Sequence, residues 1–274
     1  MATSTRELID IALEMAGMDE LPADSTVYIS GSNLNRVLFG IDIGPAELLL
    51  ARELECDAVI AHHPAGGQST MRFPEVLHKQ IEFMVVHGVS EQAAREAAQP
   101  LITRATMGAH AANHDHVPSF ARHIRMPFLN IHLPLDELGR RIMIEAIDDH
   151  LVSLDRAPVV QDALDGLMTL DEYQHALTRI MVPVGALDNP LGRIAVVHGA
   201  GTNGGARIAS AYFDAGVGTV LYIHCAGPEV AALQAAGRGN LIVAGHIASD
   251  LVGINRYVEA VEALGVDVVR TSGL

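Results

Sequence analysis

The stretch Asp57-Ala-Val-Ile-Ala-His62-His63-Pro64 decides how the rest of the chain can be interpreted. Its apolar run is typical of a buried strand, and the proline marks the strand's end, because proline cannot donate to the hydrogen-bond ladder of a sheet. In open α/β sheets, ligands bind beyond the strand ends. Neighbouring strand residues point to opposite faces, so both imidazoles reach one site only if the chain turns, and Pro64-Ala-Gly-Gly67 supplies that turn.

The residues before this strand predict a βαβ unit. Residues 36–42 form a strand candidate, Gly44-Pro45 opens a helix, and the strand at residues 57–61 follows. Two strands joined in this way are parallel, with a right-handed crossover. Further strands are predicted at residues 128–132, 193–198, 218–223, 240–244 and 266–270. Further helices are predicted at residues 6–18, 136–150, 206–215, 229–236 and 247–264. We therefore expect an α/β fold of two lobes, with open, mixed or mostly parallel sheets flanked by helices.

The middle of the chain is more polar and contains the expected domain boundary. Residues 73–125 have a helical pattern that Pro100 and Pro118 should interrupt. The mixed composition of residues 151–168 predicts an N-terminal lobe at 1–150 and a C-terminal lobe at 151–274, in which a last segment, about 240–274, returns to a shared site.

Composition excludes several classes of protein. The formal net charge of −15 opposes nucleic-acid binding, which needs a dense basic surface. Lys79 is the only lysine, so a phosphate loop of the GxxxxGK[ST] type cannot exist. No apolar run reaches the roughly 20 residues of a membrane span, and the N-terminal residues do not resemble a signal peptide. With only two cysteines, the chain predicts a cytoplasmic protein without a disulfide framework.

Three predicted strand ends carry groups that bind metal. Adjacent histidines in a chain with 14 are by themselves more often coincidence than a metal site. His246 and Asp250 are four residues apart, so they share one helix face. Asp136 lies at another strand-to-helix junction, where aspartate also serves as an N-cap. Together His62, His63 and these three residues suit a pair of divalent ions such as Zn²⁺, Mn²⁺, Fe²⁺ or Ni²⁺.

These segments resemble the Nif-three-like family, the NGG-one-interacting factor superfamily, which includes proteins described as GTP cyclohydrolase type two. The family shows His-His followed by Pro or Gly, then His-Thr-x-Leu-Asp, then Gly-His-x-x-Ser/Thr-Glu. The chain has His62-His63-Pro64, His132-Leu-Pro-Leu-Asp136 and Gly245-His246-Ile-Ala-Ser249-Asp250 in the same order.

The resemblance implies a dinuclear metal site in a cleft between two lobes and a ring-shaped homo-oligomer, commonly a hexamer. The ligands that it implies are His62, His63, Asp136, His246 and Asp250. Two departures stand out. Asp250 replaces the family's glutamate and is one methylene shorter, and Leu133-Pro134 replaces threonine and its neighbour.

Other polar residues are also candidates for binding metal or facing a substrate. The segment from His110 to His116 has histidines four apart at His110 and His114, which differs from the HxHxDH spacing of metallo-β-lactamases. We interpret it as a surface loop, with His110 and His114 as candidates for facing a substrate. Asp42 and His224, at other strand ends, are further candidates, although most strand-end residues are structural.

The stretch Gly199-Ala-Gly201-Thr-Asn-Gly204 matches GxGxxG between a strand and a helix, where backbone N–H groups can hold a phosphate. The dinucleotide fingerprint also needs an acid about 20 residues later, and the next strand ends in His224-Cys225 instead. A structural turn is therefore the better interpretation, and an oxidoreductase the weakest hypothesis.

Two functions remain. The first is a metal-dependent hydrolase, similar to GTP cyclohydrolase type two, that acts on a nucleotide-like or phosphorylated small molecule. The second is a metal-binding regulator, chaperone or interaction scaffold without turnover, which the lack of a general acid beyond the ligands and loop histidines favours.

Overall fold

The computed structural model describes residues 3–274, which divide into two compact units. Unit 1 comprises residues 3–76, 103–136 and 254–274, and unit 2 comprises residues 77–102 and 137–253. Both units are therefore discontinuous in sequence, whereas the expected lobes at 1–150 and 151–274 are continuous.

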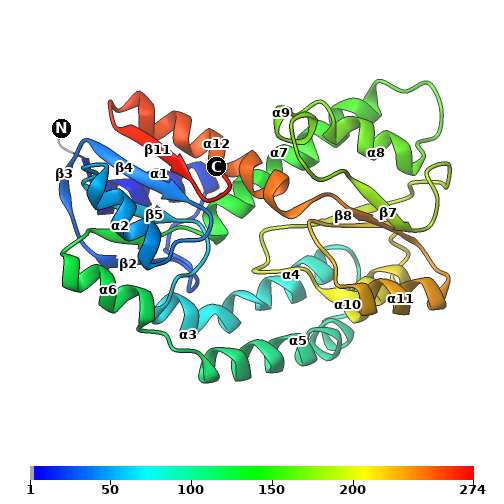
Figure 1. Ribbon diagram of the computed structural model, residues 1–274. Coiled ribbons are helices and arrows are strands. Elements are labelled where there is room, and N and C mark those ends of the chain that lie inside the picture. The colour runs from blue at the N-terminus through cyan, green and yellow to red at the C-terminus, as the bar shows by residue number, and fades with distance from the viewer. Residues whose placement is uncertain (1–2) are drawn as a thin grey trace. The chain divides into compact units, whose positions relative to one another are not determined.

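A five-stranded sheet forms the centre of unit 1, in the order β11-β4-β5-β6-β2. Its strands are β2 (Thr26–Ile29), β4 (Arg36–Gly40), β5 (Ala58–Ala61), β6 (Phe128–Asn130) and β11 (Asp267–Thr271). All neighbouring pairs are parallel except β2 with β6. Figure 1 shows β11, from the C-terminal end of the chain, beside β4 from its first part. A short ladder of β1 (Thr3–Ser4) and β3 (Ser32–Leu34) lies outside this sheet.

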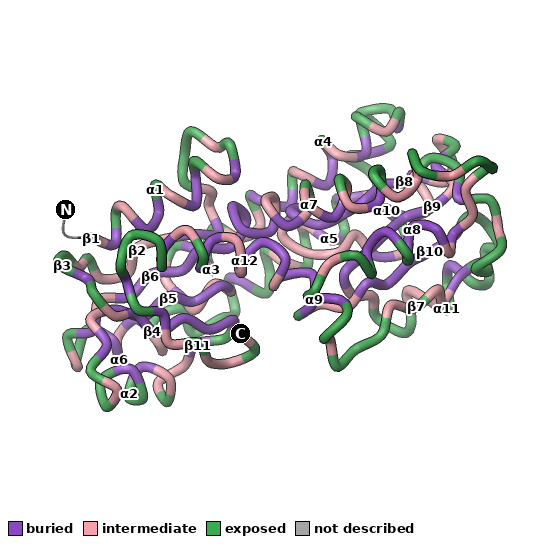
Figure 2. The backbone as a smooth tube through the Cα atoms, turned by 90° about the horizontal axis from the view of Figure 1, so that it is seen from above, coloured by how far each residue is buried: buried purple, intermediate pink, exposed green. Residues whose placement is uncertain are grey.

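Helices cover both faces of this sheet, which explains why the inner strands β4, β5 and β6 are apolar without alternation. The α1 helix (Thr5–Ala16) and the last turns of α12 (His246–Ala263) pack with Phe39 and Ile60 on one face. The α2 helix (Pro45–Glu53) and the α6 helix (His116–Ile124) pack with Leu38 and Val59 on the other. The α3 helix (Gly67–Val76) follows the turn after His62-His63. In Figure 2, β4, β5 and β6 are among the buried parts of the backbone.

Unit 2 has a four-stranded sheet in the order β7-β10-β9-β8. Its strands are β7 (Met181–Val184), β8 (Ile194–Val197), β9 (Thr219–Tyr222) and β10 (Asn240–Val243). Only β7 is antiparallel to its neighbour. The helices that lie wholly in this unit are α4 (His78–Val86), α8 (Val160–Leu167), α9 (Asp171–Gln174), α10 (Gly205–Asp214) and α11 (Gly227–Ala236).

The prediction of an α/β fold with mostly parallel sheets flanked by helices is confirmed. Of the two predicted proline interruptions, the one at Pro100 is wrong, whereas the helical pattern does break at residues 112–115, just before Pro118. Pro100 lies inside α5 (Glu91–Ala111), where Glu96 and Pro100 are both exposed, so water can solvate the carbonyl that proline leaves unbonded. Pro118 lies in the first turn of α6, where no helical N–H bond is needed. Among the described residues, no helix is both long enough and apolar enough to cross a membrane.

Candidate metal centre

The parallel register of unit 1 brings three strand ends to one edge of the sheet. Gly40 of β4 pairs with Ala61 of β5, which pairs with Asn130 of β6. The residues that follow these strands therefore lie at the same level, and His62 and His132 are among them. The sheet itself thus positions the imidazoles, as expected for strand ends of an α/β fold.

The hydrogen bonds of His62 determine which ring nitrogen carries its proton. Its Nδ1 lies 3.0 Å from the carbonyl oxygen of Ile131, and a carbonyl can only accept. Neutral His62 therefore carries its proton on Nδ1 and its lone pair on Nε2. This Nε2 lies 3.1 Å from Oδ1 of Asp136, and both side chains are buried.

The same arrangement recurs at His132, which sequence reasoning did not include among the ligands. Its Nδ1 donates to Oδ2 of Asp24 at 2.7 Å, and its Nε2 lies 3.6 Å from Oδ2 of Asp136. Asp24 is completely buried and also accepts a bond from Ser25. The position of His132 at the end of a predicted strand could have indicated it. Asp24, 108 residues away in sequence, had no such signal.

His63 completes the set. Its Nδ1 lies 2.8 Å from Oδ1 of Asp42, whose side chain is 75% exposed. The structure therefore places Asp42 as the carboxylate that orients a histidine. The ring centroids of His62, His63 and His132 lie 4.9, 5.1 and 5.6 Å apart, and their ligand atoms lie within 4.8 Å of one another.

This donor set fits a divalent cation. Metal-bound histidines usually donate their second N–H to a carboxylate or a carbonyl, as all three do here through Nδ1. Two imidazole lone pairs, those of His62 and His132, face the Asp136 carboxylate. Such groups repel one another unless a proton or a metal ion lies between them, and imidazole with carboxylate suits zinc, manganese, iron or nickel.

The turn after His63 is fixed from two sides. Tyr28 accepts a bond from the Ala65 N–H and donates one to Asn130, and burial raises the pKa of its phenol to about 12. Gly66 has φ +143°, and a Cβ there would lie 2.5 Å from the carbonyl oxygen of His114. Glycine is therefore required where the 110–116 segment packs on the turn.

The prediction of a surface loop is wrong at its start, because His110 lies in the last turn of α5. Of the two histidines, His114 meets the turn, and in the bonds that the structure describes it does so through its backbone. The His114 carbonyl accepts from the Gly67 N–H at 2.6 Å, and the side chains of His110 and His114 are exposed. Asp136 is also not an N-cap. The α7 helix (Leu133–Val152) begins three residues earlier, and the Asp136 N–H donates to the His132 carbonyl.

Unit 2 holds the other predicted pair. His246 opens α12 after β10, and its Nε2 lies 3.3 Å from Oδ2 of Asp250, one turn further along. Asp250 is buried, and His246 is partly exposed. The His224 ring lies 4.7 Å from the His246 ring, centroid to centroid.

The glycine-rich turn is already satisfied by protein groups. The first N–H groups of α10 bind the side-chain oxygens of neighbours: Gly205 donates to Asn203 at 3.1 Å, and Ala206 donates to Glu229 at 2.7 Å. A carboxylate thus occupies the helix N-terminus, where a phosphate would have to bind. Gly199, Gly201 and Gly204 therefore lie in a turn closed by Asn203 and Glu229.

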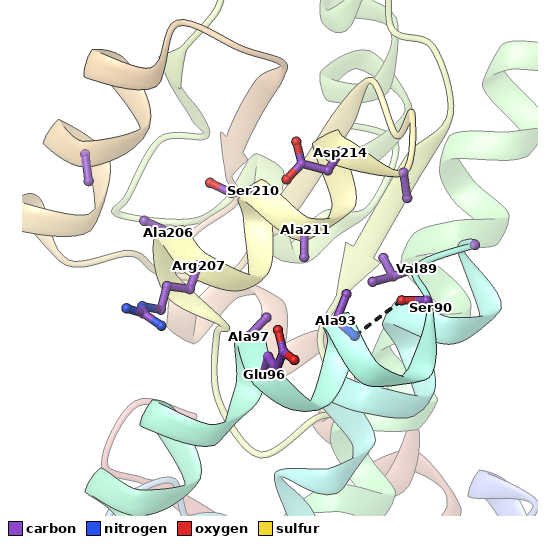
Figure 3. A pocket seen from close by; sticks show the side chains of 13 residues that line it. Val89, Ser90, Ala93, Glu96, Ala97, Ala206, Arg207, Ser210, Ala211 and Asp214 are labelled. Carbon is purple, nitrogen blue, oxygen red and sulfur yellow. Dashed lines mark hydrogen bonds between the residues drawn. The ribbon is translucent and has the colours of Figure 1, made fainter.

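Two other features of unit 2 could be mistaken for sites. His150, Asp162 and Asp165 have ligand atoms within 4.8 Å of one another, but Arg156 binds both oxygens of Asp162 at 2.6 and 2.7 Å. A cavity of about 550 Å³ lies between the start of α5 and α10 (Figure 3). Alanines line much of this cavity, and among the described residues none of the predicted site residues does.

The comparisons with known proteins identify the family. The structure is similar to the crystal structure of a NIF3 superfamily protein from Sphaerobacter thermophilus, with 65% identity over 100% of both chains and a TM-score of 0.98. Reduced HcgD from Methanocaldococcus jannaschii has 12% identity over 98% of this chain and 99% of that one, with a TM-score of 0.55. A protein from Thermus thermophilus has 16% identity over 99% of this chain and 100% of that one, with a TM-score of 0.52.

The last two likenesses show the fold alone. No family model and no curated protein matches the chain. The identity and coverage shared with the Sphaerobacter protein are high enough to assign a family, and they agree with the order of the histidine and aspartate segments. The chain belongs to the NIF3 superfamily, the Nif-three-like family.

Proposed function

We propose that this protein binds two divalent metal ions and hydrolyses a nucleotide-like or phosphorylated small molecule. The observation that carries the metal site is the orientation of His62 and His132, whose Nε2 atoms face the Asp136 carboxylate while their Nδ1 atoms donate to Ile131 and Asp24.

The residues of unit 1 would hold metal without rearranging. The carbonyl of Ile131 and the carboxylates of Asp24 and Asp42 keep the three imidazoles in the tautomer that ligates through Nε2. Burial of His62 and Asp136 excludes bulk water, which strengthens their interaction with a cation. His132 thus joins His62, His63 and Asp136 as a candidate ligand.

His246 and Asp250 are the proposed ligands from unit 2. They lie one helical turn apart and are already in contact, which suits two ligands of one ion. Because the aspartate is shorter than the family's glutamate, we propose that Asp250 binds one ion rather than bridging two.

Bound ions would supply Lewis-acid polarisation of the substrate and would lower the pKa of a coordinated water. The nucleotide-like substrate and the hexameric ring are proposed from the resemblance to the family alone. Light scattering tests the ring, and a mass of about six chains is expected.

Elemental analysis of the purified protein tests the metal site. The parent should hold about two ions per chain, and His63→Ala/Asp250→Ala should hold few. A matched control, Asp149→Asn, changes an exposed carboxylate on α7 and should keep the parental content. A parent that remains metal-free after incubation with excess Zn²⁺ or Mn²⁺ contradicts the proposal.

Turnover is tested separately on the metal-loaded parent with a panel of nucleotides and phosphoesters. Hydrolysis of a member, lost in the double variant, supports the enzyme. Full metal content without turnover of any member instead supports a regulator or scaffold that binds metal without catalysis.

A further inference from the structure

The side chain of Asn203 has only one orientation that its neighbours allow. Its Oδ1 accepts the Gly205 N–H at 3.1 Å, so its Nδ2 is the atom that faces His224, 2.7 Å from Nδ1 of the ring. An amide nitrogen only donates, so Nδ1 of His224 must accept. Neutral His224 therefore carries its proton on Nε2.

This tautomer is the reverse of that found in unit 1. His62, His63 and His132 donate through Nδ1 and have their lone pair on Nε2, as metal ligands require. His224 has its Nδ1 lone pair bound by Asn203, and its Nε2 is an N–H donor. A histidine in this state does not ligate a cation through Nε2, but it can bind an oxygen that carries negative charge.

The position of His224 places its ring next to that of a proposed metal ligand. His224 follows β9, His246 follows the adjacent parallel strand β10, and their rings lie 4.7 Å apart at an interplanar angle of 44°. His224 is partly buried, which favours a hydrogen bond that is not fully screened by water.

We propose that His224 donates a hydrogen bond from Nε2 to an anionic oxygen of the substrate, such as a phosphoryl oxygen, that is held at the ion bound by His246 and Asp250. This inference rests on the proposed function for the ion, and on the Gly205–Asn203–His224 chain for the donor. The glycine-rich turn thereby gains a role, because it fixes the tautomer of a substrate-binding histidine.

The tautomer is measured first, by nitrogen NMR of protein labelled with ¹⁵N-histidine. The Nε2 of His224 should show a directly bonded proton and Nδ1 should not. In Asn203→Asp the carboxylate accepts from Nδ1, so the proton should appear there. A proton on Nδ1 of His224 in the parent overturns the inference, whether or not the protein holds metal.

The binding role is measured with inorganic phosphate as the probe, by calorimetry on zinc-loaded protein. Loss of a charge-assisted hydrogen bond predicts about 10- to 100-fold weaker binding in His224→Ala. The metal content should not change. His224→Gln, whose amide also offers an N–H, should recover part of the affinity and provides a second variant if alanine disturbs folding.

The outcomes separate the two proposals. Parental phosphate affinity in both His224 variants, or no phosphate binding by the zinc-loaded parent, overturns the role of His224 and leaves the metal site standing. A parent that binds no metal contradicts the proposed function and with it overturns the binding role of His224, because the proposal holds the substrate oxygen at that ion.

Discussion

Two strand-to-helix junctions of the same chain use polar groups in opposite ways. The first lies after the paired strands β5 and β6, where the Nε2 atoms of His62 and His132 face the carboxylate of Asp136 while each Nδ1 donates to another group. After β8, the polar groups of the glycine-rich turn satisfy one another, since Asn203 and Glu229 accept the first N–H groups of α10.

The difference shows what makes a strand end a candidate site. Both junctions have a motif associated with ligands and both have a favourable place in an α/β fold. Only the first has acceptors that face acceptors, an arrangement that is costly without a proton or a metal ion between them. The direction in which donors and acceptors point therefore carries more information than the motif does.

The largest effect should come from the carboxylate that both imidazoles face. Asp136→Asn keeps the size of the side chain but removes the charge, so we expect metal affinity to fall by more than about 100-fold, beyond the loss typical of outer partners. Competition with a chelator measures it, with Asp149→Asn on the same helix as control. Equal metal affinities of Asp136→Asn and Asp149→Asn would show that the Asp136 carboxylate does not bind the metal.

The carboxylates behind the imidazoles should matter less, and unequally. Asp24 is fully buried and holds Nδ1 of His132, so Asp24→Asn should weaken metal binding by about 10- to 100-fold. Asp42→Asn alters an exposed partner of His63 that water can replace, and its effect should be smaller. The same chelator titration compares them, and a larger effect of Asp42→Asn would contradict this order.

At the second junction the expected effect is on stability. Glu229→Ala removes the acceptor of the Ala206 N–H, so the free energy of unfolding should fall by about 1 kcal/mol. Glu229→Gln retains an oxygen and should lose less. Denaturant unfolding measures both, and a stability of Glu229→Ala equal to the parent's would show that the carboxylate does not cap the helix.

The smallest effect on metal binding should come from the group of His150, Asp162 and Asp165. Arg156→Met should leave the metal content unchanged, because Asp162 is bound by the guanidinium of Arg156 rather than by a metal ion. The hydrogen bond from Arg156 lowers the pKa of Asp162 from 3.8 to about 2. Its contribution to stability is therefore complete above pH 3.8 and is lost as the pH falls towards about 2.

The variant should be less stable than the parent at neutral pH, and the difference should shrink as the pH falls through that window. Acid unfolding monitored by circular dichroism measures this. A loss of bound metal in Arg156→Met would instead show that this group takes part in metal binding.

The local sequence pattern predicted those strands and helices that have an uninterrupted run or a regular face of buried apolar residues. The β4-α2-β5 unit and the strands β8 to β11 could be predicted from the sequence because their apolar runs are bounded by glycine, proline or polar residues. The antiparallel edge strands β2 and β7 were missed because their residues are mostly only partly buried and their registers shift. Such strands have no apolar run to detect.

The residues of the candidate site likewise divide into those that the sequence could predict and those that it could not. His62, His63 and the pair His246–Asp250 could be chosen from spacing, since each lies at a predicted strand end. The placement of Asp24 beside His132 arises only when β2 and β6 pair. The tautomers depend on bonds of that kind, so the chemical state of the histidines could not be obtained from sequence.

The pairing of β4 with β11 has a consequence for how the protein folds as it is synthesised. Residues 36–40 bind residues 267–271, and Tyr257 donates a hydrogen bond to Leu8 across 249 positions. On the ribosome, the edge of β4 that pairs with β11 therefore stays unpaired until nearly the whole described chain has emerged. An uncovered apolar strand edge is a template for pairing with other chains. Until β11 is synthesised, this edge of a nascent chain is therefore open to pairing with other chains.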